Sequence, residues 1–188
     1  MSGGHGHIDP TNKKVALLIA ILALMLAISE TLGKSAQTTS LSLNIEAANL
    51  WSFFQAKTVR GTVLKTAAEQ HEMQLPGVAN KKVLEETEKQ IAAWKKTVAR
   101  YESEPETNEG RKELAARAKA AELKRDRSLA AYHHFELASA AAQIAIVLAS
   151  ATVITGAMWL TWIACGLGLL GVIFSVIGLF WPTAVHLF

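Results

Sequence analysis

The segment from Leu137 to Phe188 contains no Asp, Glu, Lys or Arg. Within it, residues 137–157 and 159–181 form two apolar stretches, and a third covers residues 15–33. A helix of about 20 residues, rising roughly 1.5 Å per residue, matches the hydrocarbon thickness of a bilayer. The three stretches therefore predict an all-α membrane protein with three transmembrane helices.

Charged residues are concentrated between the first and second predicted spans. Although 51% of the 188 residues are hydrophobic, 19% are charged. All 19 Lys and Arg except Lys13 and Lys14 lie between Lys34 and Arg127. Both signs are mixed and the net charge is only +3, so no basic face for nucleic acid is indicated. Residues 34–136 are therefore predicted to form a polar extramembrane domain inserted between two spans.

This inserted domain has the pattern of three helices and is predicted to be coiled-coil-like. Residues 34–75 contain no proline, and Leu75-Pro76-Gly77 marks the end of this predicted helix. Residues 81–103 have apolar side chains at 84, 91, 94, 98 and 101, a narrow helical stripe. The third helix begins after Gly110 and continues into the second span without Pro or Gly until Gly156.

The middle helix is too short to return along the whole first helix. At roughly 1.5 Å per residue, the first helix extends about 60 Å outside the lipid. Residues 81–103 cover about half of that length. We therefore expect the middle helix to lie across the domain or to pack on a neighbouring copy.

Small residues recur at steps of three and four in every predicted span, which keeps them on one helix face. Such faces let helix backbones approach closely in a membrane and favour homo-oligomers. The residues predicted to pack are Ala16, Ala20, Ala23 and Ala27 in the first span, Ala145, Ala149 and Gly156 in the second, and Gly168, Gly171, Ser175 and Gly178 in the third.

Glu30 is the one acidic or basic residue within a predicted span. It continues the small-residue stripe of the first span, and Ser139 and Gln143 are expected at a similar depth in the second. A carboxylate inside a membrane faces protein more often than lipid, because lipid exposure costs a few kcal/mol. Glu30 is thus either a proton or ion site or a structural residue that is hydrogen-bonded or exposed at the membrane interface, and Ser139 and Gln143 are its candidate partners.

Amphipathic residues mark the predicted membrane surface. His133 and His134 precede the second span, and Trp159 and Trp181 bracket the third. Adjacent histidines point about 100° apart on a helix, so they cannot both bind one metal ion within a chain. We therefore expect no metal site there.

The remaining sequence carries no recognisable chemistry. No nucleophile elbow, phosphate-binding loop or pair of acids in an apolar setting is present, so we expect neither an enzyme nor a cofactor. Cys165 is the single cysteine and lies in an apolar run. The tail 1–14 is predicted to be disordered and polar, although His5, His7 and Asp9 could hold a metal loosely, and residues 182–188 form a short tail.

The flanking charges give the expected orientation. Lys13 and Lys14 favour a cytoplasmic N-terminus, whereas Arg125 and Arg127 argue for the opposite, and the first signal usually dominates. Residues 15–33 could also be read as a cleaved signal peptide. That apolar run is long for a signal peptide and lacks a good cleavage site, so an uncleaved anchor is expected.

Four segments together resemble a known family. They are NKKVALLIAILALMLAISETLGKSAQT, WSFFQAKTVR, EGRKELAARAKAAE and YHHFELASAAAQIAIVLASATVITG, in that order. They look like a family of small bacterial membrane proteins catalogued only as a domain of unknown function. The resemblance covers nearly the whole chain and implies a protein of the bacterial inner membrane. It implies no activity, cofactor or catalytic residue.

Two functions follow as hypotheses. The first is a structural, scaffold or accessory membrane protein that self-associates through its small-residue faces and helical stalk. Its surroundings are the lipid bilayer, and membership of a larger membrane complex stays open. The second is a pore or transport component, in which a ring of Glu30 side chains selects cations.

Overall fold

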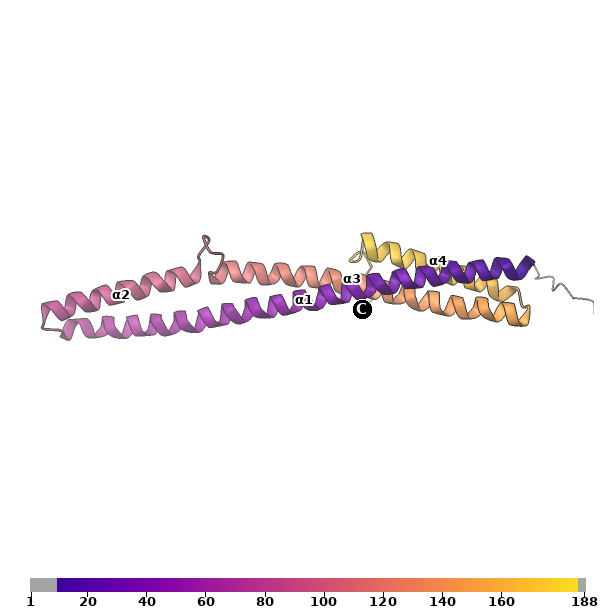
Figure 1. The fold of residues 1–188 in the computed structure, drawn as a ribbon. Helices are drawn as coiled ribbons and strands as arrows, with labels where there is room; N and C mark the ends of the chain where they lie inside the picture. Colours follow the sequence, from indigo (N-terminus) through magenta and orange to yellow (C-terminus); the bar gives the residue numbers. More distant parts are fainter. Residues whose placement is uncertain (1–9, 186–188) are drawn as a thin grey trace, which may run out of the picture. The chain divides into compact units, whose positions relative to one another are not determined.

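The computed structural model describes residues 10–185, and in these the chain is all-α (Figure 1). The four helices are α1 (Pro10–Gln74), α2 (Lys81–Glu102), α3 (Arg111–Thr155) and α4 (Trp159–Phe180), with a 3₁₀ turn at Leu75–Gly77. Three of them, α1, α3 and α4, are long and apolar enough to cross a membrane. The chain is therefore a membrane protein by the length and composition of its helices. Most of the tail predicted for residues 1–14, including His5, His7 and Asp9, lies outside the described residues, as do residues 186–188.

The chain divides into two compact units. The apolar unit consists of Met1–Leu41 and Arg125–Phe188, and the charged unit consists of Ser42–Lys124. The apolar unit therefore contains the three stretches predicted to cross the membrane. The charged unit holds most of the polar domain predicted between the first two.

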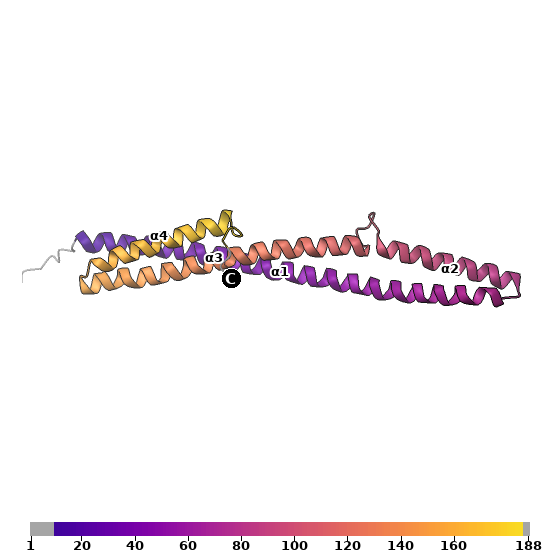
Figure 2. The same ribbon diagram turned by 180° about the vertical axis from the view of Figure 1, so that it is seen from behind.

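In the apolar unit, α4 packs beside both the first part of α1 and the last part of α3 (Figure 2). Ser29 Oγ on α1 lies 3.1 Å from Ser175 Oγ on α4. Thr152 Oγ1 on α3 lies 3.2 Å from Thr161 Oγ1 on α4. Because only Gly156, Ala157 and Met158 separate α3 from α4, these two helices form a tight antiparallel hairpin.

Most buried residues of the apolar unit are small. Gly168 and Gly171 on α4 face Leu22 and Met25 on α1 so closely that an added Cβ atom would lie 2.7 Å from either side chain. Close approach of backbones is how helices pack where lipid supplies no hydrophobic drive between them. The fully buried alanines are Ala138, Ala142, Ala145 and Ala149 on α3 and Ala164 on α4.

Gly156 is not buried within the chain, and its role as a helix-packing residue stays a prediction. It is exposed and has a φ of 72°, the left-handed conformation that glycine adopts after a helix C-terminus. Its backbone N–H donates to the carbonyl of Thr152 at 2.8 Å. Within the chain, Gly156 therefore ends α3.

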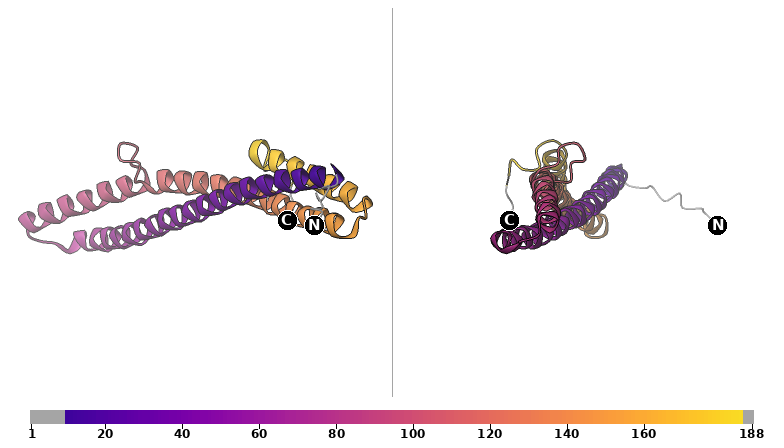
Figure 3. Two further views of the ribbon diagram at one scale, coloured as in Figure 1. Left: turned by 45° about the vertical axis from the view of Figure 1, so that its right-hand side comes forward. Right: turned by 90° about the vertical axis from the view of Figure 1, so that its left-hand side faces the viewer.

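In the charged unit, α2 runs antiparallel along α1 of the same chain (Figures 1 and 3). Lys95 of α2 forms an ion pair with Glu72 of α1, and Glu104, just after α2, lies 3.4 Å from Lys57 of α1. The expectation that the middle helix lies across the domain or packs on another copy is therefore wrong. The return along α1 is shared, because the start of α3 follows α2 and packs on α1 through Leu114 and Ala118.

The apolar stripe predicted for residues 81–103 is the face that α2 presents to α1. Ile91 is buried, and positions 84, 94, 98 and 101 are half-buried. Asn80 starts this helix, since its side-chain oxygen accepts hydrogen bonds from the backbone N–H groups of Lys82 and Val83. A thin seam of this kind buries little area, so polar contacts contribute to holding α2 in place.

Candidate functional site

The intramembrane polar residues predicted from sequence lie together in one cleft of the apolar unit. The cleft has a volume of about 420 Å³ and is formed by α1 and α3. Glu30, Ser139 and Gln143 all line it. Its other lining residues are Ser29, Gly33, Lys34, Gln37, Tyr132, Phe135, Glu136 and Ala140.

Gln143 is the hydrogen-bond partner of Glu30 and Ser139 is not. The Nε2 atom of Gln143 donates to Oε1 of Glu30 at 3.3 Å. The hydroxyl of Ser139 donates instead to the carbonyl of Phe135 on its own helix, at 2.9 Å. One hydrogen bond therefore supports the interpretation of Glu30 as a structural residue, although its side chain stays exposed within the chain.

Five polar residues of the cleft were missed by the sequence analysis, and one of them is Ser29, which precedes Glu30. Lys34 and Gln37 follow Glu30 at helical spacing on α1, and Tyr132 and Glu136 come from α3. The Tyr132 hydroxyl donates to Oε1 of Glu136 at 3.5 Å. The spacing of 30, 34 and 37 could have identified the α1 side, but the match with α3 depends on how the two helices pack. The two carboxylates and the amine that line the cleft can bind protons or small ions.

The two adjacent histidines occupy different environments. His134 is fully buried, and its Nε2 lies 3.1 Å from the carbonyl oxygen of Pro182, so Nε2 carries the proton and donates. His133 is partly exposed, with Nδ1 3.6 Å from a carboxylate oxygen of Glu136. His134 therefore connects the segment after α4 to α3, and the position of both histidines at a membrane surface stays a prediction.

The two tryptophans lie at opposite ends of α4. Trp159 begins the helix and Trp181 follows it, and each is 63% exposed. Their placement suits anchors at two bilayer surfaces, which stays a prediction.

The small-residue faces differ in what covers them. The predicted residues of α3 and α4, apart from the exposed Gly156, are used within the chain, since Ser175 contacts Ser29 and the others, Ala145, Ala149, Gly168, Gly171 and Gly178, are buried. Those of α1 are not. The exposed members of the α1 face are Ala16, Ala20, Ala23 and Ala27.

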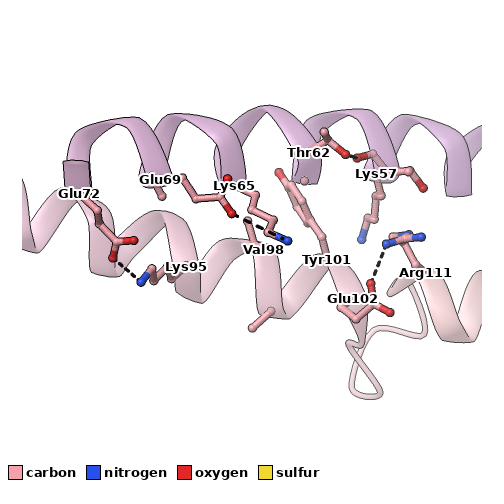
Figure 4. Close-up of a pocket in the computed structure, with 14 residues that line it drawn as sticks. Lys57, Thr62, Lys65, Glu69, Glu72, Lys95, Val98, Tyr101, Glu102 and Arg111 are labelled. Atoms are coloured by element: carbon pink, nitrogen blue, oxygen red, sulfur yellow. Dashed lines mark hydrogen bonds and ion pairs between the residues drawn. The ribbon is translucent and has the colours of Figure 1, made fainter. Parts of the chain in front are cut away.

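A second cavity lies in the charged unit, between α1 and α2, with a volume of about 730 Å³ (Figure 4). Lys57 extends into it from α1 and Tyr101 from α2. The Lys57 ammonium lies 5.1 Å from the ring centre of Phe53 and 5.6 Å from that of Tyr101. Ammonium groups are attracted to aromatic faces at such distances.

Lys57 is the buried charge of this region. Its side chain is only 7% exposed, and Nζ lies 3.4 Å from Glu104 and 3.8 Å from Glu109. Arg111, at the start of α3, packs over the Phe54 ring at 5.0 Å and donates to Glu102 at 2.7 Å. Acidic partners therefore balance both cations. The side chains at this cavity hold three helices together, and this arrangement does not favour an anion site.

Glu113 ties the start of α3 to the end of α2. Its carboxylate accepts hydrogen bonds from the Ser103 hydroxyl at 2.7 Å and from the backbone N–H of Glu104 at 3.1 Å. The hydrogen bond from Ser103, followed by that from Glu104, holds the pKa of Glu113 below its ordinary value, and desolvation opposes this in part. Gly110 allows the closure, because a Cβ atom there would lie 2.4 Å from the Glu104 nitrogen.

Metal-binding geometry is not found in residues 13–185, where no three His, Cys, Asp or Glu side chains are grouped to hold an ion. Cys165 is exposed and unbridged.

Comparison with known proteins assigns the family. Residues 11–181 match DUF4337, a domain of unknown function. No curated protein and no solved structure matches the chain. Since the match includes the cleft, the charged unit and all four helices almost completely, the chain belongs to the DUF4337 family.

Proposed function

We propose that this chain is a structural membrane protein, a scaffold or an accessory subunit, whose copies associate side by side in the bilayer. One observation carries the proposal. The chain buries the small-residue faces of α3 and α4 internally and leaves Ala16, Ala20, Ala23 and Ala27 of α1 exposed.

The two exposed sides of α1 suit different surroundings. Large side chains that favour lipid lie on one side, with Leu17 and Leu24 each 63% exposed and Ile21 57% exposed. The alanines lie on the other side, where a second helix can approach closely. A helix that faced only lipid would gain nothing from segregating its small residues in this way.

Glu30 supports the same contact surface. It continues the alanine stripe by one further step and is exposed in the single chain, with Gln143 as its hydrogen-bond donor. An ionisable side chain open to lipid is unfavourable by a few kcal/mol, and protein cover removes most of that cost. A second copy on the alanine face would supply such cover.

The experiment introduces bulk on the alanine face. Single-molecule fluorescence energy transfer between labelled copies in liposomes measures association as the protein-to-lipid ratio is raised. We expect Ala20→Leu with Ala27→Leu to weaken association at least tenfold, since both sites are exposed and the fold of the chain tolerates them. The matched control is Ile21→Leu with Ile28→Leu, which alters the lipid side of the same turns and should associate like the wild type. Wild-type monomers at every ratio, or unchanged association of the alanine variant, would refute the proposal.

The pore or transport function remains the alternative, and one feature favours it. Glu30 faces outward beside the alanine stripe, so a ring of copies joined through α1 would gather Glu30 side chains around an axis. Cation flux in liposomes that is present in wild type and lost in Glu30→Gln would support this function. Absence of flux in both would remove it.

The location of the protein completes the proposal. We place it in a bacterial inner membrane, with its N-terminus in the cytoplasm and the charged unit on the far side, because Lys13 and Lys14 precede the first apolar stretch. The copies could belong to a larger membrane complex. A membrane-impermeant maleimide applied to whole cells should label a cysteine substituted for Glu106 if this orientation holds, and should leave it unlabelled if the orientation is reversed.

A further inference from the structure

The face of α1 that points away from α2 and α3 in the charged unit carries no charge. We call it the outer stripe and define it by nine residues, all exposed. They are Ile45, Ala48, Ser52, Ala56, Val59, Val63, Thr66, Gln70 and Met73.

These nine residues share one side of the helix. Their steps are three or four residues, and at about 100° per residue they fall within an arc of roughly 100°. The opposite side holds the buried contacts with the rest of the unit, among them Ala47, Leu50 and Lys57. The outer stripe is therefore a second seam, separate from the one that binds α2 and α3.

The stripe is unusually apolar for a face outside the membrane stretches. Val59 is 63% exposed, Val63 is 61% exposed and Met73 is 75% exposed. The charged residues of α1 in this unit all lie off the stripe, and they are Glu46, Lys57, Arg60, Lys65, Glu69 and Glu72. By contrast, α2 carries Lys, Arg or Glu at almost every second position. Apolar residues kept clear of charge over this length mark a contact surface.

We infer that the outer stripe binds the outer stripe of a second copy of this chain, with the two α1 helices parallel. This rests on the proposed self-association and extends it to the charged unit. A surface for an unlike partner gains from complementary charge, whereas a stripe without charge can face its own copy without repulsion. Copies inserted in one membrane with the same orientation also present the same face at the same height, which aligns equal residues.

The spacing of the stripe fits such a parallel pair. From Ser52 onward the steps alternate four and three, as in a heptad seam, and β-branched Val59 and Thr66 are seven residues apart. Ser52, Thr66 and Gln70 make the seam weaker than an all-aliphatic one. Its association therefore depends on the membrane, which keeps the copies concentrated and oriented.

Single cysteines test the register in full-length protein. In a Cys165→Ala chain reconstituted in liposomes, Ile45→Cys and Val59→Cys are each compared with Glu46→Cys and Arg60→Cys, their neighbours off the stripe. All four native side chains are exposed, so the substitutions leave the fold intact. Facing Cα atoms must come within about 7 Å to form a disulfide. We expect mild oxidation to cross-link the two stripe positions at least fivefold faster than the two neighbours.

A charge exchange keeps the test independent of disulfide chemistry. Val59→Glu or Val59→Lys alone should weaken association measured by energy transfer, and a mixture of the two variants should restore it. Equal cross-linking at all four positions, or cross-linking only between unlike stripe positions such as 45 and 73, would overturn the inference. If wild-type copies associate in liposomes and the stripe positions do not cross-link, this inference fails alone. If the wild type does not associate, the proposed function fails first.

Discussion

The helices of the apolar unit and those of the charged unit are held together in different ways. In the apolar unit the fully buried residues are mostly alanine, and glycines on α4 let α1 and α3 approach its backbone. In the charged unit a thin apolar seam around Ile91 and Leu114 is supplemented by Lys57, Arg111 and Glu113. Close fit of backbones is how helices pack when lipid supplies no hydrophobic drive between them, whereas in the charged unit ion pairs supplement a narrow apolar seam.

This difference between the units implies that the largest loss of stability follows when side-chain volume is added inside the apolar unit. A side chain at Gly171 would meet Met25 at 2.7 Å and the backbone carbonyl oxygen of Ala138 at 3.2 Å, so Gly171→Ile cannot be accommodated without separating the helices. Overpacking of this kind costs about 3 kcal/mol. Unfolding in detergent mixtures of increasing SDS content, followed by tryptophan fluorescence, should show a matching loss of stability.

Gly166 gives the control on the same helix. It is exposed, and no atom of a neighbouring helix lies within 4 Å of a Cβ atom placed there, so Gly166→Ile should be nearly neutral. Equal effects at the two glycines would show that close backbone approach does not hold the apolar unit together.

The second-largest loss of stability is expected in the charged unit, when the buried charge of Lys57 is removed. Lys57→Met leaves Glu104 without its closest cation and removes the contacts with two aromatic rings. Because Glu104 keeps partial access to water, we expect a loss of about 2 kcal/mol. Trp51 and Trp94 report on this unit when the other tryptophans are replaced by Phe, and thermal unfolding of that chain gives the change.

Lys65 is the matched lysine for this measurement. Its side chain is 69% exposed and lies 3.9 Å from Glu69, so Lys65→Met should change stability by less than about 0.5 kcal/mol. A Lys57 variant as stable as the Lys65 variant would mean that the apolar seam suffices.

The smallest expected effect concerns pH. The pKa of Glu113 is lowered by folding, so its contribution to stability is present above its unfolded value of 4.5 and is lost as pH falls through the folded value. Glu113→Gln should therefore lower the melting temperature of the charged unit at neutral pH and flatten its decline on acidification below about pH 5. Glu106→Gln, an exposed loop substitution, should keep the wild-type pH profile. A wild-type profile for Glu113→Gln would show that the Ser103 and Glu104 contacts do not stabilise the fold.

Local patterns were enough to predict the elements. Apolar length identified the three helices that can cross a membrane, and the stripe at 84, 91, 94, 98 and 101 identified the face of α2 that contacts α1. The position of α2 was predicted wrongly, because no pattern in residues 81–103 shows that α2 and the start of α3 share the return along α1. The candidate cleft was predicted in part. Glu30 and Gln143 were paired by depth, whereas Lys34 and Glu136 required the packing of α1 on α3.

Composition and periodicity by themselves determined that this chain is helical, has three segments long and apolar enough to cross a membrane, and has a charged insertion. The physical reason is that apolar length and helical spacing are properties of single segments. The tertiary structure decided which small-residue faces are covered within the chain and which stay exposed. All the predicted stripes look alike in sequence, yet those of α3 and α4 are covered and that of α1 is exposed, because burial depends on which neighbour each helix face meets.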